Sequence, residues 1–177
     1  KYQQKTALII DGHQLSYLKL NALANQMANS LVKSGVSPGD RVTLYGANTW
    51  EWVISYYAVL KVGAVVNPIN VMLTPEEVTF VVEDCGAKVI IASKEKGRPL
   101  MGLKGQSSIE KLILYGTEIP VEATAFDQFI EGASEVFISP DIDKDSLSTI
   151  CYTSGTTGKP KGAMLSHKAV TTNILMT

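Results

Sequence analysis

The sequence contains few of the residues that build disulfide frameworks and metal centres. Its 177 residues include two cysteines, Cys85 and Cys151, and two histidines, His13 and His167. The cysteines show neither CxxC nor Cys/His spacing, so the sequence indicates neither a disulfide framework nor a zinc site. A chain without disulfides is typical of a reducing compartment, and we therefore expect a cytoplasmic protein.

Long apolar runs and an excess of one sign of charge are also missing. The longest apolar stretch, 53–66, is interrupted by Lys61 and is shorter than the roughly 18 residues of a membrane-spanning helix. Sixteen basic and seventeen acidic residues give a net charge of −1. We expect no transmembrane segment, no signal peptide and no nucleic-acid partner. The sequence starts at Lys1 without an initiator Met and stops at Thr177 inside a helical pattern, which predicts truncation at both ends.

The rest of the chain alternates short apolar runs with amphipathic stretches. Asp11-Gly12 lies between two such runs and predicts a small opening β-hairpin. Apolar residues at helical spacing follow Ser16, and Gly35 and Pro38 are expected to end this helix. Strands are expected at 41–45, 64–67, 88–92 and 111–115.

Two later helices have clear start and stop signals. Asn48 is expected to cap the first, with Glu51 completing a capping-box arrangement and Gly63 ending the helix. Thr74-Pro75-Glu76-Glu77 supplies the N-cap, first-turn proline and capping-box glutamate of the second, which closes at Gly86. This alternation predicts an α/β fold with a mainly parallel sheet flanked by helices and right-handed crossovers. Loops are expected at 93–108 and 117–145, with one short helix near 126–130.

One loop carries the clearest chemical signal. The apolar run 147–152 leads into Thr153, Ser154, Gly155, Thr156, Thr157, Gly158, Lys159, Pro160, Lys161 and Gly162. Three glycines let the backbone turn its N–H groups toward an anion, and hydroxyls and lysines add donors and positive charge. The NTPase motif GxxxxGK[ST] does not fit, because Thr153 stands at its first glycine and Pro160 at its Ser/Thr position. A Rossmann GxGxxG is absent too, so the residues predict a phosphate-binding loop of another kind.

The stretch Ile150–Lys161 (ICYTSGTTGKPK) resembles the phosphate-binding loop of the adenylate-forming, or AMP-binding, superfamily. That superfamily includes acyl-CoA synthetases, peptide-synthetase adenylation domains and beetle luciferases. Leu15–Leu20 resembles its early (T/S)Y-x-EL motif, with Lys19 in place of the usual glutamate, and Leu60–Pro68 resembles its LKAGA-x-x-VP motif. The resemblance covers nearly the whole chain.

This resemblance implies that residues 1–177 are a partial N-terminal AMP-binding domain, within the large domain of an acyl-CoA synthetase-like fold. The family's later motifs have no counterpart before Thr177: the acyl-pocket segment, the Tyr-Gly-x-Thr-Glu segment, the ribose-binding aspartate, the hinge and the catalytic lysine of a small C-terminal domain. We expect no catalytic residue within the fragment, no C-terminal domain and no ligase activity in the isolated chain.

The parent enzyme implied by the resemblance uses ATP, Mg²⁺ and CoA. A carboxylate attacks the α-phosphorus of ATP to give an acyl-adenylate and pyrophosphate, and a thiol then displaces AMP. By match to the motif, residues 153–161 would bind the nucleotide phosphates, and Thr153 would also reach the metal. We further expect residues 154–161 to be mobile without nucleotide, because they carry no large apolar side chain.

The stretches Gly63–Asn70 and Leu73–Glu77 are most similar to long-chain fatty-acyl-CoA ligases, which suggests a role in lipid metabolism. An aryl or short-chain acid:CoA ligase is the alternative, since the residues that sort acyl chains lie beyond this sequence. A stand-alone phosphate-binding module is a second alternative, and a phosphotransferase a third, although HRD, DFG and GK[ST] elements are missing. Small molecules are the expected partners. Peripheral membrane association of the parent and self-association through truncated surfaces remain open.

Other chemically capable residues have structural explanations. His167 is expected at a helix start behind the N-cap Ser166, Cys151 in a buried strand, and His13 in solvent. Aromatic residues on the helix after Asn48 are expected in the core rather than in a ligand platform: Trp50, Trp52, Tyr56 and Tyr57. A solvated helix face explains the carboxylates Glu76, Glu77, Glu83 and Asp84.

Overall fold

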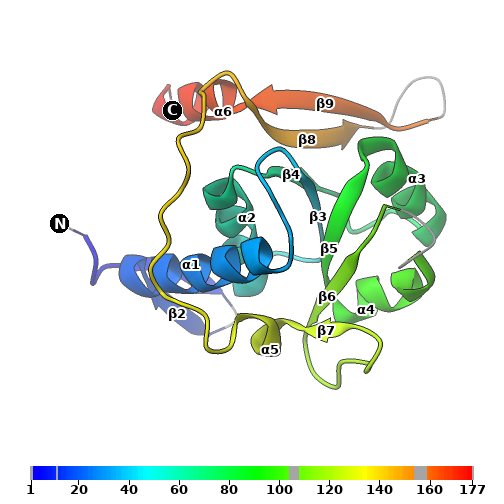
Figure 1. Cartoon of the computed structure of the whole chain (residues 1–177), viewed down its shortest axis with the longest axis horizontal. Helices are drawn as coiled ribbons and strands as arrows, with labels where there is room; N and C mark the ends of the chain where they lie inside the picture. The colour runs from blue at the N-terminus through cyan, green and yellow to red at the C-terminus, as the bar shows by residue number, and fades with distance from the viewer. Residues whose placement is uncertain (1, 11, 104–107, 154–158, 177) are drawn as a thin grey trace.

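The computed structural model describes residues 2–10, 12–103, 108–153 and 159–176 (Figure 1). Its elements in chain order are β1 Thr6–Ile10, β2 His13–Ser16, α1 Tyr17–Lys33, β3 Arg41–Tyr45, α2 Trp50–Val62, β4 Val65–Pro68, α3 Pro75–Cys85, β5 Ala87–Ser93, α4 Lys94–Gly97, the 3₁₀ helix η1 Arg98–Leu103, β6 Lys111–Tyr115, β7 Thr124–Ala125, α5 Phe126–Ile130, β8 Leu147–Thr153, β9 Lys161–Ser166 and α6 His167–Leu175.

The main sheet has the strand order β7-β6-β5-β3-β4-β8-β9. Neighbouring strands run parallel from β7 to β8, and β9 pairs with β8 in the antiparallel sense. Strands β1 and β2 form a separate antiparallel hairpin. The predicted α/β class, mainly parallel sheet and opening hairpin are therefore confirmed.

Helices cover both faces of this sheet. Alternate residues of β3 and β5 join different apolar clusters, because successive side chains of a strand point to opposite faces. Val42 and Val89 pack with α1, α2 and α5 on one face. Tyr45 and Ile90 pack with α3 and η1 on the other. The central strands are buried from both sides, which explains their nearly continuous apolar sequences.

The crossovers from β3 to β4 and from β4 to β5 share one hand. The first crossover goes from β3 toward the β9 end of the strand order, and its helix α2 lies on the sheet face that α1 also covers. The second goes back from β4 toward the β7 end, and its helix α3 lies on the opposite face. Reversing both the direction and the face preserves the hand, as the right-handed rule requires. Which hand the two crossovers share stays a prediction.

Two predictions about local structure are wrong. Thr49 rather than Asn48 caps α2, because its Oγ1 accepts a hydrogen bond from the Trp52 backbone N–H at 3.3 Å. Glu51 is consequently the second residue of the helix and does not complete a capping box. The expected loop at 93–108 contains α4 and η1, where buried Leu100 packs against α3. Partly buried Met101 and Leu103 pack against the same cluster. Three apolar residues within four positions of a polar stretch give too weak a periodicity to reveal such short helices.

The other predicted start and stop signals of these helices are confirmed, and Thr74 forms a complete capping box with Glu77. The structure adds an N-cap that was not predicted, Ser16, whose side chain accepts a hydrogen bond from the Lys19 N–H at the start of α1. Gly35, Gly63 and Gly86, each with positive φ, follow α1, α2 and α3. The short helix predicted near 126–130 is α5.

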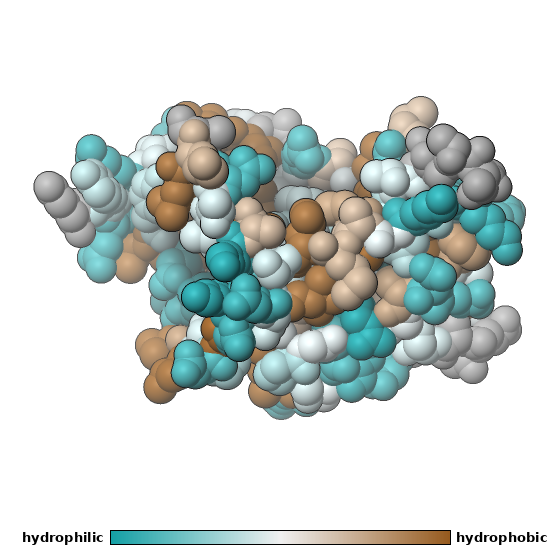
Figure 2. All heavy atoms as spheres, turned by 90° about the horizontal axis from the view of Figure 1, so that it is seen from above, coloured by the Kyte–Doolittle hydropathy of each residue, from teal (hydrophilic) through white to brown (hydrophobic). Residues whose placement is uncertain are grey.

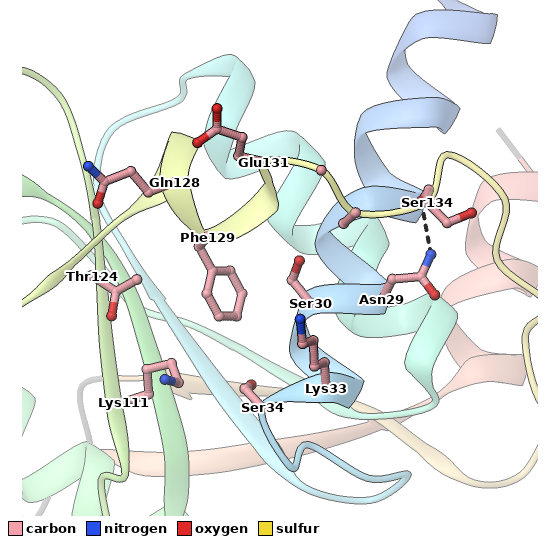
Figure 3. Close-up of a pocket in the computed structure, with 12 residues that line it drawn as sticks. Asn29, Ser30, Lys33, Ser34, Lys111, Thr124, Gln128, Phe129, Glu131 and Ser134 are labelled. Atoms are coloured by element: carbon pink, nitrogen blue, oxygen red, sulfur yellow. Dashed lines mark hydrogen bonds between the residues drawn. The ribbon is translucent and has the colours of Figure 1, made fainter.

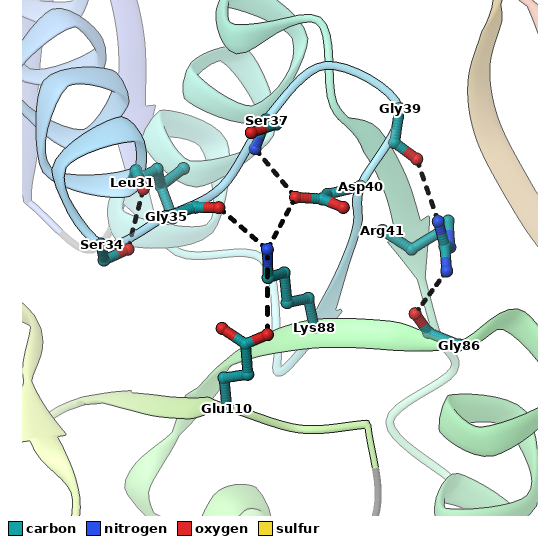
Figure 4. A network of polar contacts seen from close by, with 10 residues as sticks. All are labelled: Leu31, Ser34, Gly35, Ser37, Gly39, Asp40, Arg41, Gly86, Lys88 and Glu110. Atoms are coloured by element: carbon teal, nitrogen blue, oxygen red, sulfur yellow. Dashed lines mark hydrogen bonds and ion pairs between the residues drawn. The ribbon is translucent and has the colours of Figure 1, made fainter.

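Two cationic side chains fasten the edge of the sheet where the parallel strands begin (Figure 4). The Lys88 ammonium donates to the Gly35 carbonyl at 2.9 Å and pairs with Asp40 at 3.2 Å. Arg41 donates from Nε to the Cys85 carbonyl at 2.7 Å and from Nη2 to the Gly86 carbonyl at 2.8 Å. These bonds fix the ends of α1 and α3 against the strands.

The β9 and α6 side of the molecule is far less covered than the rest. Met164 on β9 is 69% exposed, and no described residue of α6 is buried. Viewed onto this side, apolar side chains gather near the middle of the face (Figure 2). Within the described parts of the chain, no helix has the length and apolar character needed to cross a membrane.

Candidate phosphate-binding hairpin

Strands β8 and β9 hold the two ends of the predicted phosphate loop together. Thr153 pairs with Lys161, and Tyr152 pairs with Gly162 in the antiparallel register. Thr153, Lys159 and Lys161 are exposed, and Pro160 is partly buried. Ser154, Gly155, Thr156, Thr157 and Gly158 lie outside the described residues, and so does most of the segment expected to be mobile. The structure thus brings Thr153 and Lys161, the two ends of the predicted loop, side by side.

Asn67 fastens β8 to the centre of the sheet. This fully buried residue of β4 donates from Nδ2 to the Ile150 carbonyl at 3.0 Å. Its Oδ1 accepts a hydrogen bond from the Thr43 hydroxyl of β3 at 2.9 Å. The Cys85 thiol lies 3.7 Å from the same oxygen. One side-chain amide therefore links the neighbouring strands β3, β4 and β8 of the sheet.

Gly162 was predicted to help turn backbone N–H groups toward an anion, but the structure gives a packing reason for this glycine. Its φ lies outside the left-handed region, and it belongs to β9 rather than to an anion-binding turn. A Cβ added there would lie 2.9 Å from Cγ2 of Ile150 and 3.1 Å from Cζ of Tyr152. Glycine is needed at this position because the Tyr152 ring approaches the β9 backbone closely.

Helix α3 contacts both flanks of the loop. The Tyr152 hydroxyl, one residue before Thr153, donates a hydrogen bond to the Asp84 carboxylate. The Lys159 ammonium lies 5.5 Å from the centroid of the Phe80 ring. Burial raises the pKa of Tyr152, and the bond to Asp84 raises it further, so the phenol keeps its proton and remains a donor. Sequence reasoning missed both α3 residues, because carboxylates and aromatics on a helix carry no sign of their distant partners.

Most structural explanations given for other residues are confirmed. His167 begins α6, with Ser166 as its N-cap, and His13 is exposed. Cys151 is only partly buried rather than fully buried, and burial raises the pKa of its thiol. The α3 carboxylates are exposed as expected: Glu76, Glu77, Glu83 and Asp84.

The aromatic cluster on α2 is predicted correctly except at one position. Trp50, Trp52 and Tyr56 pack against the core, and the rings of Trp52 and Tyr56 stack with centroids 5.5 Å apart. Tyr57 is 48% exposed, contrary to the expectation that it lies in the core. It falls outside the helix face that buries Ile54 and Ala58.

The described residues offer little to a metal ion on their own. They contain no group of three His, Cys, Asp or Glu side chains arranged to hold one. The exposed Thr153 provides one hydroxyl oxygen, a ligand type that suits Mg²⁺. Because Mg²⁺ usually takes few protein ligands together with substrate phosphates, Thr153 fits a supporting ligand and not a complete site.

An open hollow lies at the other end of the strand order (Figure 3). Its volume is about 660 Å³, and its lining includes Lys33, Lys111, Gln128 and Phe129. The hollow borders α1, β6, β7 and α5, whereas the hairpin is at the β8–β9 end. It therefore belongs to a different part of the molecule from the predicted phosphate site.

The mainly parallel sheet, covered by helices on both faces, places the protein among the α/β proteins. Residues 1–177 match the family model described as AMP-binding enzyme, and the chain belongs to this family.

The names of similar curated proteins indicate different products and substrates. The chain is 34% identical over 175 residues to tyrocidine synthase 3 of Brevibacillus parabrevis, covering 99% of this chain and 2% of that protein. It is 30% identical to a 3-hydroxybenzoate/4-hydroxybenzoate–CoA ligase of Thauera aromatica, covering 94% and 32%. It is 32% identical to the long-chain-fatty-acid–CoA ligase FadD13 of Mycobacterium tuberculosis, covering 89% and 30%. The chain thus spans about a third or less of these relatives.

Solved structures agree with the family. The anthranilate CoA ligase AuaEII in complex with anthranoyl-AMP superposes with a TM-score of 0.90 at 28% identity, covering 94% of this chain and 32% of that one. ATP-bound MatB from Rhodopseudomonas palustris gives a TM-score of 0.80 at 32% identity, covering 93% and 32%.

Proposed function

We propose that this chain is the part of the N-terminal domain of an ATP-dependent acid:CoA ligase that binds the phosphates of ATP. The observation that carries the proposal is the β8–β9 hairpin, which pairs Thr153 with Lys161 at the two ends of a loop rich in glycine and hydroxyls. Family membership over residues 1–177 supports it. So do the ligands bound in two similar structures, anthranoyl-AMP and ATP.

The chemistry of the proposed site is electrostatic. When a carboxylate attacks the α-phosphorus of ATP, negative charge develops on the departing pyrophosphate. Donors already directed at that charge lower the barrier, and a single such donor contributes about 3–4 kcal/mol in well-studied enzymes. In this chain the donors are Thr153, Lys159 and Lys161, together with Ser154, Gly155, Thr156, Thr157 and Gly158 of the same loop. Pro160 has no N–H to donate and would restrict the backbone between the two lysines. Bound Mg²⁺ would add further positive charge at the phosphates, with Thr153 as a supporting ligand.

The acid substrate is proposed to be a fatty acid, whose CoA ester the full-length enzyme would release into lipid metabolism. The similarity of Gly63–Asn70 and Leu73–Glu77 to fatty-acyl-CoA ligases supports this choice, as does the 32% identity to FadD13. Aryl acids are the second candidate, because a hydroxybenzoate–CoA ligase is among the relatives. A cytoplasmic enzyme associating peripherally with membranes would suit the first candidate.

The isolated 177-residue chain is proposed to bind ATP or pyrophosphate weakly and to have no ligase activity. One loop supplies only part of the groups that adenylation needs, and removing several groups that act as a unit abolishes turnover rather than reducing it by a fraction. We also propose that the chain self-associates through the exposed β9 edge, where Met164 and Leu165 face solvent. Sedimentation equilibrium should show dimers that Met164→Lys abolishes, and monomers at all concentrations would contradict this.

Carboxylate-dependent exchange of ATP with pyrophosphate tests the proposed function. The 177-residue chain and the full-length enzyme are assayed with a panel of fatty and aromatic acids. We expect exchange by the full-length enzyme alone, with fatty acids preferred. Exchange by the fragment near the full-length rate would show that catalysis needs nothing beyond Thr177, and a full-length enzyme inactive with every acid would refute the ligase assignment.

Binding of pyrophosphate to the 177-residue chain provides a second test. Isothermal titration should show an affinity that falls about tenfold in Lys161→Ala, because a charge-assisted contact to phosphate is lost. Lys33→Ala removes the same charge from the other end of the sheet and is the matched control. Equal losses in the two variants would indicate a general charge effect rather than a site.

A further inference from the structure

Helix α3 lies against both flanks of the predicted phosphate loop, although it is 60 or more residues away in the sequence. Asp84 accepts the hydrogen bond of Tyr152, which is separated from it by 68 positions. Phe80, four residues earlier on the same helix, lies beneath the ammonium of Lys159. Residues four apart are neighbours on one helix face, so a single stripe of α3 reaches the chain both before and after the loop.

Each of these two α3 contacts involves, or directly adjoins, a residue that is proposed to bind phosphate. Tyr152 precedes Thr153, which pairs with Lys161, and Lys159 is itself a proposed phosphate contact. We infer that Asp84 and Phe80 are positioning residues that hold the loop's flanks in register for a polyphosphate ligand. This inference rests on the proposed function for its ligand and adds the residues that orient the site.

The rest of α3 gives this stripe a firm base. Val78, Val81 and Val82 are completely buried against the sheet, and a capping box fixes the helix start at Thr74. Asp84 is exposed and Phe80 is partly buried, so both lie at the margin of this packed face. A rigid helix with two contacts at its margin can help to fix the hairpin. On its other side β8 pairs with β4, where Val66 lies opposite Thr149 and the Asn67 side chain bonds to Ile150.

Because Asp84 is negatively charged, the direction in which pyrophosphate affinity changes when it is replaced tests the inference. A carboxylate near the loop should repel pyrophosphate, so removing it would strengthen binding if Asp84 acted only through its field. Positioning predicts the opposite. Asp84→Ala should weaken pyrophosphate binding about three- to fivefold through loss of the Tyr152 bond, and Tyr152→Phe should do the same. Asp84→Asn retains an acceptor oxygen and should preserve most of the affinity.

Phe80 is tested with a pair of aromatic variants. Phe80→Leu keeps an apolar side chain but removes the ring beneath Lys159, and it should weaken pyrophosphate binding about two- to fivefold. Phe129→Leu is the matched control, because the Lys111 ammonium lies 5.8 Å from the centroid of the Phe129 ring, far from the hairpin. Glu83→Gln is the charge control, since Glu83 is an exposed neighbour of Asp84.

Two measurements on the 177-residue chain separate the inference from the proposed function. Hydrogen exchange of β8 and β9 amides, measured without ligand, should become faster in Asp84→Ala, Tyr152→Phe and Phe80→Leu but not in the controls. Pyrophosphate titration should show weaker binding in the same variants, and Asp84→Ala combined with Tyr152→Phe should be no weaker than either single variant. Unchanged exchange, or affinity that is unchanged or increased, would overturn the positioning role. Absence of pyrophosphate binding by the unmodified chain would overturn the proposed function instead, while exchange would still decide whether α3 holds the hairpin.

Discussion

The side-chain amide of Asn67 in β4 donates a hydrogen bond to the backbone carbonyl of Ile150 in β8, with the two atoms 3.0 Å apart. Asn67→Leu keeps the approximate volume but leaves the Thr43 hydroxyl and the Ile150 carbonyl without this partner in a buried place. We expect the free energy of unfolding to fall by about 3 kcal/mol, because each buried polar group that loses its partner costs about 1–3 kcal/mol. Urea denaturation measures the change.

The graded control for this prediction is Thr43→Val. It removes the hydrogen bond from the Thr43 hydroxyl to Asn67 Oδ1. The bond from Asn67 to the Ile150 carbonyl stays, and the Cys85 thiol still lies near Asn67 Oδ1. The expected loss of stability is therefore smaller, about 1 kcal/mol. Equal stability of Asn67→Leu and the unmodified protein would show that β8 does not depend on this amide.

Asn67 also illustrates what the sequence can and cannot predict. The strand predicted at 64–67 follows from its apolar run, and the helices follow from caps such as Thr74 and stops such as Gly63, which are local signals. The partner of Asn67 lies 83 positions away, and that of Asp84 lies 68 positions away, so neither appears in any short window of sequence.

In the candidate site, too, some features could be predicted from the sequence and others could not. The composition of residues 153–161 is enough to predict phosphate binding, because glycines, hydroxyls and lysines act through local chemistry. The register that pairs Thr153 with Lys161, and the packing reason for Gly162, required the three-dimensional arrangement. Asn48 was mistaken for the α2 cap because Asn and Thr are both good caps and stand next to each other, so sequence alone could not choose between them.

Gly162→Ala should distort the hairpin while leaving the rest of the fold intact. The added methyl would lie within 3.1 Å of Ile150 and Tyr152 atoms, so one of these side chains or the β9 backbone must move. We expect a loss of about 1–3 kcal/mol, typical of overpacking, and faster hydrogen exchange in β8 and β9. Gly102→Ala, where nothing lies within 4 Å of the added atom, is the control. A hairpin equally protected in both variants would contradict the close approach seen here.

The amides of α1 hold the extended segment that leads from α5 toward β8. Asn29 donates from Nδ2 to the carbonyls of Ser134 and Val136 at 2.9 and 3.0 Å, and Asn25 donates to Glu135 at 2.7 Å. Asn29→Ala should lower the free energy of unfolding by about 1 kcal/mol and speed proteolysis within 133–139. Asn21→Ala, on an exposed position of the same helix, should change neither. If both variants are cleaved at the unmodified rate, these amide bonds do not restrain the segment.

Tyr115 should make stability fall at high pH. Its side chain lies in the core beside Phe126, and burial raises its pKa from 10.0 to about 12, with the Glu51 carboxylate adding to the shift and the Thr49 hydroxyl opposing it. Between these two values the unfolded chain loses the phenol proton while the folded chain keeps it, so the unfolded state binds fewer protons. Stability must then decrease as pH rises from about 10 to about 12, and the contribution of Tyr115 is constant below that range.

Tyr115→Phe should show a shallower decrease rather than none, because burial also raises the pKa of Tyr45 and of Tyr152. Chemical denaturation of both proteins at pH 8, 10 and 12 gives the comparison, and parallel curves over this range would mean that the Tyr115 phenol ionises as readily in the folded protein as in the unfolded chain.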